Sequence, residues 1–353
     1  MALSSLRMVS AQAGWATGWT IKGSAGGILH STDGGGTWQV VSPPALDSAR
    51  IDSPFFLDAS HAWFVTSQGK ATAAQPAAVT TTIERTEDGG NSWLPGAPLH
   101  LQSGGPGWLD FIDAQHGWYM ANLGESGGSM AVEIFQTADG GQSWASVSTT
   151  DGTLGPSTPG SLPASCNKTG ISFADLQTGW ATAHCATGGV FFYTTRDGGR
   201  TWRDQPLRPP TPGETSLFQS GDCETSPPVV PPGSNGSAVL RLFASGREVL
   251  LFYTQDGGHT WHASQMVRSA TVRSPIFVSA RDGWTTDESQ LFVTHDGGQS
   301  WSAGAHLPSL RFLGALDFAD LRDGWVTDGV GAFETHDGGQ SWLPFSPTMG
   351  KAD

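Results

Sequence analysis

The sequence predicts an all-β fold in which one four-stranded unit is repeated seven times. Three observations predict it. A near-invariant octet of the form T-x-D-G-G-x-[ST]-W, which begins with Ser31 in its first copy, recurs seven times, and a second phrase, F-x-D-x-x-x-G-W, precedes most copies of the octet. The 353 residues also include 48 Gly and 22 Pro, which separate many short apolar runs. No stretch of helical length keeps a period of about 3.6 residues, so the pattern favours strands and turns.

The octet predicts a tight turn between two antiparallel strands. The Asp carboxylate accepts hydrogen bonds from backbone N–H groups just ahead of it, and the Gly pair adopts the positive φ that the reversal needs. The Trp opens the next strand as an apolar anchor, beside a Thr or Ser that can hydrogen-bond back to the loop. The aspartates are Asp33, Asp88, Asp139, Asp197, Asp256, Asp296 and Asp337, and the tryptophans are Trp38, Trp93, Trp144, Trp202, Trp261, Trp301 and Trp342.

The second phrase adds a strand on each side of a short turn. Clear copies occupy residues 111–118, 173–180 and 318–325, and looser copies end at Trp15, Trp63 and Trp284. Each unit therefore contains a strand, a short turn, a strand, a variable loop, a strand, the octet turn and a last strand. Four short antiparallel strands in about 50 residues are typical of one blade of a β-propeller.

We expect one domain over residues 1–353, a seven-bladed β-propeller with the octet turns between the third and fourth strands. No spare strand for closing the ring is obvious. Closure therefore depends either on tryptophans packed between blades or on the tail after Trp342 adding to the first blade. The approximate blades are 5–46, 47–98, 99–150, 166–208, 222–268, 271–307 and 308–347.

The charge balance narrows the classes of partner. A formal net charge of −14, with no cluster of Lys and Arg, argues against nucleic acid and anionic lipid as ligands. No run of 18 apolar residues is present, so no transmembrane segment is predicted. The N-terminus has no apolar region of signal-peptide type. We expect an extracellular or periplasmic monomer from which an export signal has been removed.

The three cysteines leave two interpretations open. Cys166 precedes the first strand of the fourth blade and Cys185 ends its second strand, so a disulfide between them is plausible. Cys223 then stays reduced or becomes the alternative partner. The other interpretation is three reduced, partly buried thiols in a cytosolic protein.

The octet resembles the Asp-box, or BNR repeat, of sialidases, xyloglucanases and sorting-receptor propellers. Together with the F-x-D-x-x-x-G-W phrase, it is similar to the photosystem II stability and assembly factor family and its relatives in non-photosynthetic bacteria. The resemblance covers residues 6 to 345. It implies that the box lies at the periphery with a structural aspartate, without a metal, and that the protein acts as an exported scaffold. The chain is acidic and poor in lysine, unlike that family, so the photosystem partner is not carried over.

The topology indicates where a ligand would bind. If both turns close strands at one end of the ring, the longer loops emerge at the other end, at 66–82, 122–131, 148–168 and 204–225. Trp19 and Trp108 belong to neither repeated phrase and map to this end. They are candidate ligand-binding residues for a sugar or a protein partner. The alternative is that each packs under its own loop.

Two carboxylates are weak candidates for catalysis. Asp110 and Asp317 occupy equivalent positions on the inner strands of the third and seventh blades, across the expected tunnel. Such a pair suits an inverting acid and base or a bound cation. The alternative is two hydrogen-bonded or solvated carboxylates of the tunnel wall.

The sequence lacks the motifs of the enzyme families considered. The Arg-Ile-Pro phrase of sialidases is absent, the histidines are scattered singly, and no phosphate-binding or nucleophile motif is present. We therefore expect no cofactor and a non-catalytic binding or assembly scaffold, whose loop-rich face contacts a protein partner or a glycan. The alternatives are an Asp-box-type glycoside hydrolase or lyase and a lectin-like carbohydrate-binding propeller.

Overall fold

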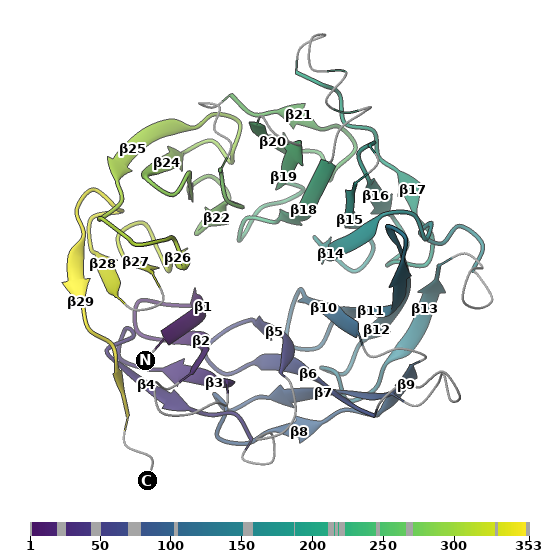
Figure 1. Ribbon diagram of the computed structural model, residues 1–353, viewed down its shortest axis with the longest axis horizontal. Helices are drawn as coiled ribbons and strands as arrows, with labels where there is room; N and C mark the ends of the chain where they lie inside the picture. Colours follow the sequence, from purple (N-terminus) through teal and green to yellow (C-terminus); the bar gives the residue numbers. More distant parts are fainter. Residues whose placement is uncertain are drawn as a thin grey trace.

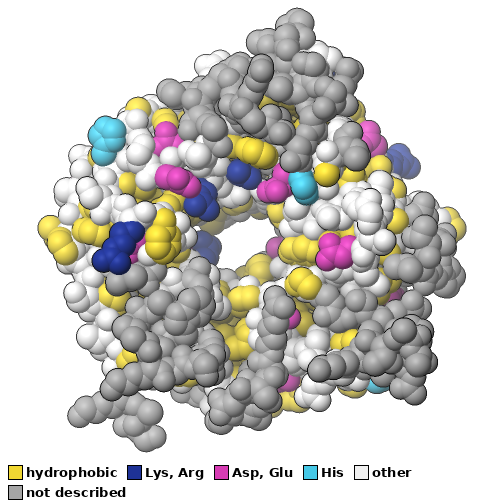
Figure 2. Space-filling view, in the orientation of Figure 1, with side chains coloured by type: hydrophobic (Ala, Val, Ile, Leu, Met, Phe, Trp, Pro, Cys, Tyr) yellow, Lys and Arg dark blue, Asp and Glu magenta, His cyan; other side chains and the backbone are white. Residues whose placement is uncertain are grey.

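The chain forms a ring of antiparallel sheets around a central opening, as the ribbon view of the computed structural model shows (Figure 1). The opening is also visible in the space-filling view (Figure 2). Among the described residues, only Thr215 and Phe218 have helical backbone, so the predicted all-β arrangement is confirmed. The structure describes residues 2–19, 26–43, 51–69, 79–101, 105–150, 158–186, 188–210, 215, 218, 223–244, 248–265, 271–328 and 331–350.

The first sheet joins the two ends of the chain. Its fifth strand is the C-terminal tail, which pairs in parallel with β4 and places Thr348 opposite Thr37. The Thr348 amide donates to the Gly36 carbonyl at 2.9 Å. Of the two closure mechanisms expected from the sequence, addition of the tail to the first unit is therefore present. The strands are β1 (Ala2–Met8), β2 (Gly14–Trp19), β3 (Gly26–Ser31), β4 (Thr37–Val40) and β30 (Thr348–Met349).

The next two sheets follow in chain order. The second contains β5 (Asp52–Phe56), β6 (Ala62–Gln68), β7 (Val79–Thr86) and β8 (Leu94–Pro95), with β9 (Leu99–Leu101) also paired to β7. The third contains β10 (Gly105–Phe111), β11 (Gly117–Ser126), β12 (Ser129–Thr137) and β13 (Ala145–Thr149). The prediction of a long loop at 122–131 is wrong. β11 and β12 stay paired as far as Ser126 and Ser129, because Gly127 and Gly128 both adopt positive φ and close a two-residue hairpin.

One larger sheet contains eight strands, because β15 and β18 pair across what the sequence divides into two units. Its first part comprises β14 (Asn167–Phe173), β15 (Gly179–Cys185), β16 (Phe192–Thr195) and β17 (Arg203–Asp204). Its second part comprises β18 (Cys223–Val229), β19 (Ala238–Ala244), β20 (Glu248–Thr254) and β21 (His262–Ala263).

Two four-stranded sheets complete the ring. They contain β22 (Ile276–Phe277), β23 (Gly283–Thr286), β24 (Gln290–Thr294) and β25 (Ser302–His306), and then β26 (Ala315–Phe318), β27 (Gly324–Thr327), β28 (Ala332–Thr335) and β29 (Leu343–Phe345). β26 packs between β22 and β1, which brings the end of the chain back to its beginning. None of the described segments forms a helix long and apolar enough to cross a lipid bilayer.

The core lies between neighbouring sheets. Buried apolar side chains form clusters that draw on two adjacent sheets, such as the one containing Trp118 of β11 and Phe173 of β14. The largest fully buried side chains are the second-strand tryptophans Trp15, Trp63, Trp118 and Trp180, together with Trp38. Burial of these rings is the main favourable contribution to the ring architecture.

Candidate functional site

All seven octet turns share one hydrogen-bond pattern. In the third copy, the Thr137 hydroxyl donates to Oδ1 of Asp139 at 2.8 Å, and Ser143 donates to the same carboxylate through its amide at 2.9 Å and its hydroxyl at 2.6 Å. Gly140 and Gly141 have φ of 70° and 91°, which a residue with a Cβ adopts only with strain. The aspartates of the other copies accept the same bonds.

These bonds affect the charge of the box carboxylates. Bonds from the Ser341 hydroxyl and amide, and from the Thr335 hydroxyl, lower the pKa of Asp337 to about 2. A carboxylate that stays ionised and accepts hydrogen bonds from residues of its own turn stabilises that turn. Within the described residues, no group of three or more His, Cys, Asp or Glu side chains could hold a metal ion.

The octet turn and the short F-x-D-x-x-x-G-W turn lie at the same end of each sheet. The Gly140 amide of the third octet donates to the Gln115 carbonyl in the short turn at 2.9 Å, and the Gly338 amide of the last octet donates to the Arg322 carbonyl at 2.9 Å. We call this end of the ring the turn face. The opposite end, where the connections between successive sheets and between second and third strands lie, is the loop face.

The second-strand tryptophans connect each sheet to the next. Trp63 stacks on Phe111 at a centroid distance of 3.8 Å, and its Nε1 donates to the Gly140 carbonyl in the next octet turn at 2.8 Å. Trp284 makes the same pair of contacts with Phe318 and Gly338. The two repeated phrases therefore interact across the gap between sheets.

The two candidate catalytic carboxylates also connect sheets. Oδ2 of Asp110 accepts a bond from the Phe173 amide at 2.6 Å, and Oδ2 of Asp317 accepts one from the Met8 amide at 2.5 Å. Arg7 lies 3.2 Å from Oδ1 of Asp317. Their strands, β10 and β26, lie on opposite sides of the central opening (Figure 1). Each carboxylate is thus bonded to the inner strand of the next sheet, and the structure does not bring the two together as a pair.

Burial changes the acidity of both groups. It raises the pKa of Asp110 to about 7, although the Phe173 amide opposes the shift. It raises the pKa of Asp317 to about 6, against the charge of Arg7. A carboxyl group with a pKa near neutrality can act as a general acid, so the shifts alone are compatible with catalysis.

Of the two candidate ligand-binding tryptophans, the structure describes the side chain of Trp108 alone. Trp108 is partly buried in β10 and packs against the core cluster of Trp118 and Phe173. Its Cδ1 lies 3.2 Å from where a Cβ on Gly170 would be, so the ring covers the backbone of β14. Trp19 ends β2, and its side chain lies outside the described residues. So do parts of the loops expected at 66–82, 148–168 and 204–225.

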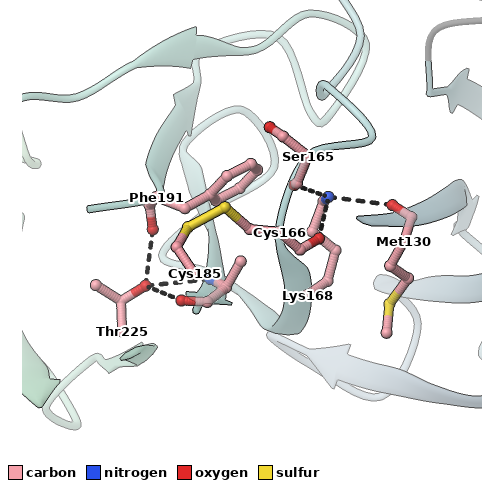
Figure 3. Close-up of a disulfide and its surroundings, with 8 residues drawn as sticks. Met130, Ser165, Cys166, Lys168, Cys185, Phe191 and Thr225 are labelled. Atoms are coloured by element: carbon pink, nitrogen blue, oxygen red, sulfur yellow. Dashed lines mark hydrogen bonds between the residues drawn. A yellow bond between two sulfur atoms is a disulfide. The ribbon is translucent and has the colours of Figure 1, made fainter. Parts of the chain in front are cut away.

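Cys166 and Cys185 form a disulfide at the loop face, next to a buried lysine (Figure 3). The ammonium group of Lys168 donates to the carbonyls of Met130, Ser165 and Cys166 at 3.1, 2.7 and 3.1 Å. These bonds hold the segment before β14 against the β11–β12 hairpin. Sequence reasoning missed this lysine, because nothing in the repeat marks its position as buried.

A cavity of about 370 Å³ lies at the loop-face end of the inner strands, at the mouth of the central channel. It is lined by Leu6 of β1, Leu316 of β26, and Arg273 and Leu313 just before β22 and β26. The Arg273 guanidinium lies 3.2 Å from Glu288 Oε1. Phe312, which precedes Leu313 in the chain, is 59% exposed. We call this site the channel-mouth pocket. Sequence reasoning missed it, because its walls come from three separate sheets.

Comparison with known proteins agrees with this geometry. The BNR/Asp-box repeat family matches residues 252–263 and 292–303, which are the fifth and sixth octet turns. None of the curated proteins matches the sequence. The fold is similar to that of YCF48 bound to a D1 peptide, at 15% identity over 95% of this chain and 93% of that one, with a TM-score of 0.56.

Two enzymes share the fold over part of their length. An ancestral GH74 enzyme has 13% identity over 97% of this chain and 46% of its own, with a TM-score of 0.54. A prolyl endopeptidase has 10% identity over 98% of this chain and 50% of its own, with a TM-score of 0.59. The chain thus spans about half the length of these two enzymes.

The class of protein follows from the turns and the ring. The chain carries BNR/Asp-box repeats on a β-propeller fold. Among the solved structures, it shares this fold with the photosystem II assembly factor YCF48. At these identities the similarity extends to the fold alone.

Proposed function

We propose that this chain is a seven-bladed β-propeller and acts as a non-catalytic binding or assembly scaffold through its loop face. Two units of the eight-stranded sheet, β14 to β17 and β18 to β21, count as two blades, and the other five sheets count as one each. The added strands β9 and β30 then extend four-stranded blades. The blade limits expected from the seven octets support the same division.

The channel-mouth pocket carries this proposal. Its volume of about 370 Å³ is within the range of small binding sites. Its lining combines aliphatic side chains with Ser5, Thr286 and the Arg273 guanidinium, and the exposed Phe312 directly precedes Leu313 in the chain. A pocket that combines aliphatic and hydroxyl groups with a guanidinium suits a peptide segment that presents an apolar side chain and an acidic group. The partner we propose is accordingly a protein segment.

The polar groups of the repeat support a structural role for the turn face. The box aspartates accept local bonds, and the second-strand tryptophans and inner-strand aspartates join adjacent blades. These residues are used to hold the ring. The disulfide supports export, because disulfides persist in extracellular and periplasmic compartments. We therefore propose an extracellular or periplasmic location for a monomeric scaffold.

A glycoside hydrolase or lyase is the second candidate, and the raised pKa of Asp110 and of Asp317 favours it. Against it, the hydrogen bonds of both carboxylates to backbone amides keep them within the blade interfaces. A lectin-like propeller is the third candidate and would use Trp108, together with Trp19. Against it, Trp108 is partly buried over Gly170.

A peptide array run in parallel with a panel of chromogenic glycosides tests the three. We expect peptide binding that is lost in Phe312→Ala and Arg273→Glu, and no hydrolysis of glycosides. Arg322→Ala, on the exposed turn face, is the matched control and keeps the binding. Turnover that disappears in Asp110→Asn or Asp317→Asn would establish the hydrolase instead. Sugar binding that disappears in Trp108→Ala would establish the lectin.

A further inference from the structure

A second cavity lies on the outer side of the ring, between the last strands of the fourth and fifth blades. Its volume is about 710 Å³. One wall follows β17 and includes Gln205 and Arg208, and the other follows β20 and β21 and includes Tyr253, His259 and His262. We call it the outer groove. It is separate from the channel-mouth pocket, which lies between the inner strands of the sixth, seventh and first blades.

Aromatic rings form the groove's second wall and floor. The rings of Tyr253 and His262 lie 5.6 Å apart at 36°. Trp261 beneath them is 7% exposed and is held edge-on by Trp180 and Phe192 at 5.7 and 5.1 Å. Prolines form much of the opposite wall. A flat aromatic wall of this kind suits the apolar face of a pyranose ring.

The groove carries one guanidinium group and several neutral polar groups. Arg208 supplies a guanidinium, while His259, His262 and Gln205 supply N–H groups, and no carboxylate is among the described lining residues. The neighbouring box carboxylate of Asp256 accepts the Thr260 amide at 2.9 Å and its hydroxyl at 2.6 Å. Because Arg208 is cationic and the described lining residues include no carboxylate, the groove favours a ligand with an anionic group.

The positions on either side of the octet vary from blade to blade, and only the fifth copy places a Tyr before it and a His after it. The position of Tyr253, directly before the octet, holds Val293 in the sixth blade and Glu334 in the seventh. The position of His262, directly after the octet, holds Ser302 in the sixth blade. Because both positions lie outside the octet, the turn does not require these two side chains.

We infer that the outer groove binds an acidic saccharide, with the sugar ring against Tyr253 and a uronic carboxylate at Arg208. The aromatic wall favours a sugar over an acidic peptide, which would need the donors but not the flat apolar surface. Arg208 pairs with the carboxylate in the bidentate manner of guanidinium groups. This site is independent of the scaffold function proposed for the loop face.

Titration calorimetry with a galacturonate oligosaccharide tests the inference, with its neutral methyl ester as the matched ligand and a short poly-glutamate peptide as the rival. We expect the acid to bind at least about 10-fold more tightly than the ester. We also expect Arg208→Ala and Tyr253→Val to lose that binding, Tyr253→Phe to retain it, and Ser302→Ala to leave it unchanged.

The possible outcomes separate the interpretations. A melting temperature equal to wild type in each variant shows that a loss of binding is local, and His262→Ser provides a second disruption if Tyr253→Val unfolds. No binding of the acid, equal binding of the ester, binding unaffected by Arg208→Ala, or tighter binding of poly-glutamate would each overturn the inference.

Discussion

Trp118 of β11 lies flat against Phe173 of β14, with ring centroids 3.7 Å apart and planes inclined by 4°. Its Nε1 also donates to the Gly198 carbonyl of the next octet turn at 3.0 Å. One side chain thus connects the third blade to both repeated phrases of the fourth. The same arrangement at Trp63 and Trp284 indicates that the repeats encode the interfaces between blades as well as the blades.

Trp118→Ala should therefore destabilise the protein strongly. Loss of a fully buried indole leaves a cavity between two blades and should lower the free energy of unfolding by about 3–5 kcal/mol. Urea unfolding followed by circular dichroism measures this change. Leu321→Ala is the control, because this side chain is 54% exposed and its loss should change the midpoint little. Equal midpoints for the two variants would contradict the proposed role of the tryptophan.

The contribution of Asp110 to the stability of the protein should fall as the pH rises from about 4 to about 7. Burial raises the pKa of Asp110 from an ordinary 3.8 to about 7, so the folded chain binds more protons than the unfolded chain within this window. The contribution of this group is complete below pH 4 and is lost as the pH rises through its folded pKa. The slope from one such group is at most about 1.4 kcal/mol per pH unit.

Asp110→Asn should flatten this slope, because the amide carries no charge at any pH and its oxygen can still accept from Phe173. Denaturant midpoints of wild type and variant, measured from pH 4 to 8, provide the comparison. The pKa of Asp317 is also raised, and this residue is present in both proteins. The difference between the two curves therefore reports on Asp110 alone. Parallel curves would show that Asp110 titrates normally in the folded state.

Removing the disulfide should destabilise the loop-face end of the fourth blade. Cys166 and Cys185 are 19 residues apart, and a cross-link of this span contributes about 3 kcal/mol in the chain-entropy account. The double substitution Cys166→Ser, Cys185→Ser should lower the melting temperature, and added reductant should then have no further effect. A wild-type melting temperature that does not respond to reductant would count against the bridge.

Deleting residues 346–353 should open the ring at the first blade. The tail contributes the amide of Thr348 to the Gly36 carbonyl and that of Gly350 to the Trp38 carbonyl, at 2.9 and 2.8 Å. Loss of two such bonds should cost about 1–3 kcal/mol. Hydrogen exchange should accelerate at β4 before it does in the other outer strands. Uniform exchange across all blades would indicate that tryptophan packing alone closes the ring.

The repeat made much of the fold predictable. The octet specifies its own turn, because the Asp139 carboxylate is bonded by the nearby Thr137 and Ser143 and the Gly pair supplies the positive φ. The short turns were predictable for the same reason, since the Asp113 carboxylate accepts from the amides of Gln115 and His116 in its own turn. The hairpin at Gly127 and Gly128 was expected as a loop, because its flanking residues lack the alternation of apolar and polar side chains that marks a half-buried strand.

Contacts between distant segments were harder to predict. The equivalence of Asp110 and Asp317 was evident from the repeat, but their bonds to Phe173 and Met8 depend on how neighbouring inner strands are placed. The channel-mouth pocket is lined by residues from both ends of the chain, such as Leu6 and Leu316, so no local pattern marks it. The outer groove was equally hidden, because the position of Tyr253, before the octet, differs in every copy.

The central claim is that the loop face, at the channel mouth, is where this propeller binds its protein partner. Hydrogen–deuterium exchange of the chain with and without a peptide selected on the array tests it most directly. We predict that the bound peptide protects backbone amides at residues 5–6, 273–276 and 313–316, and leaves the octet turns unchanged. Protection confined to the octet turns or to the outer strands would contradict the claim.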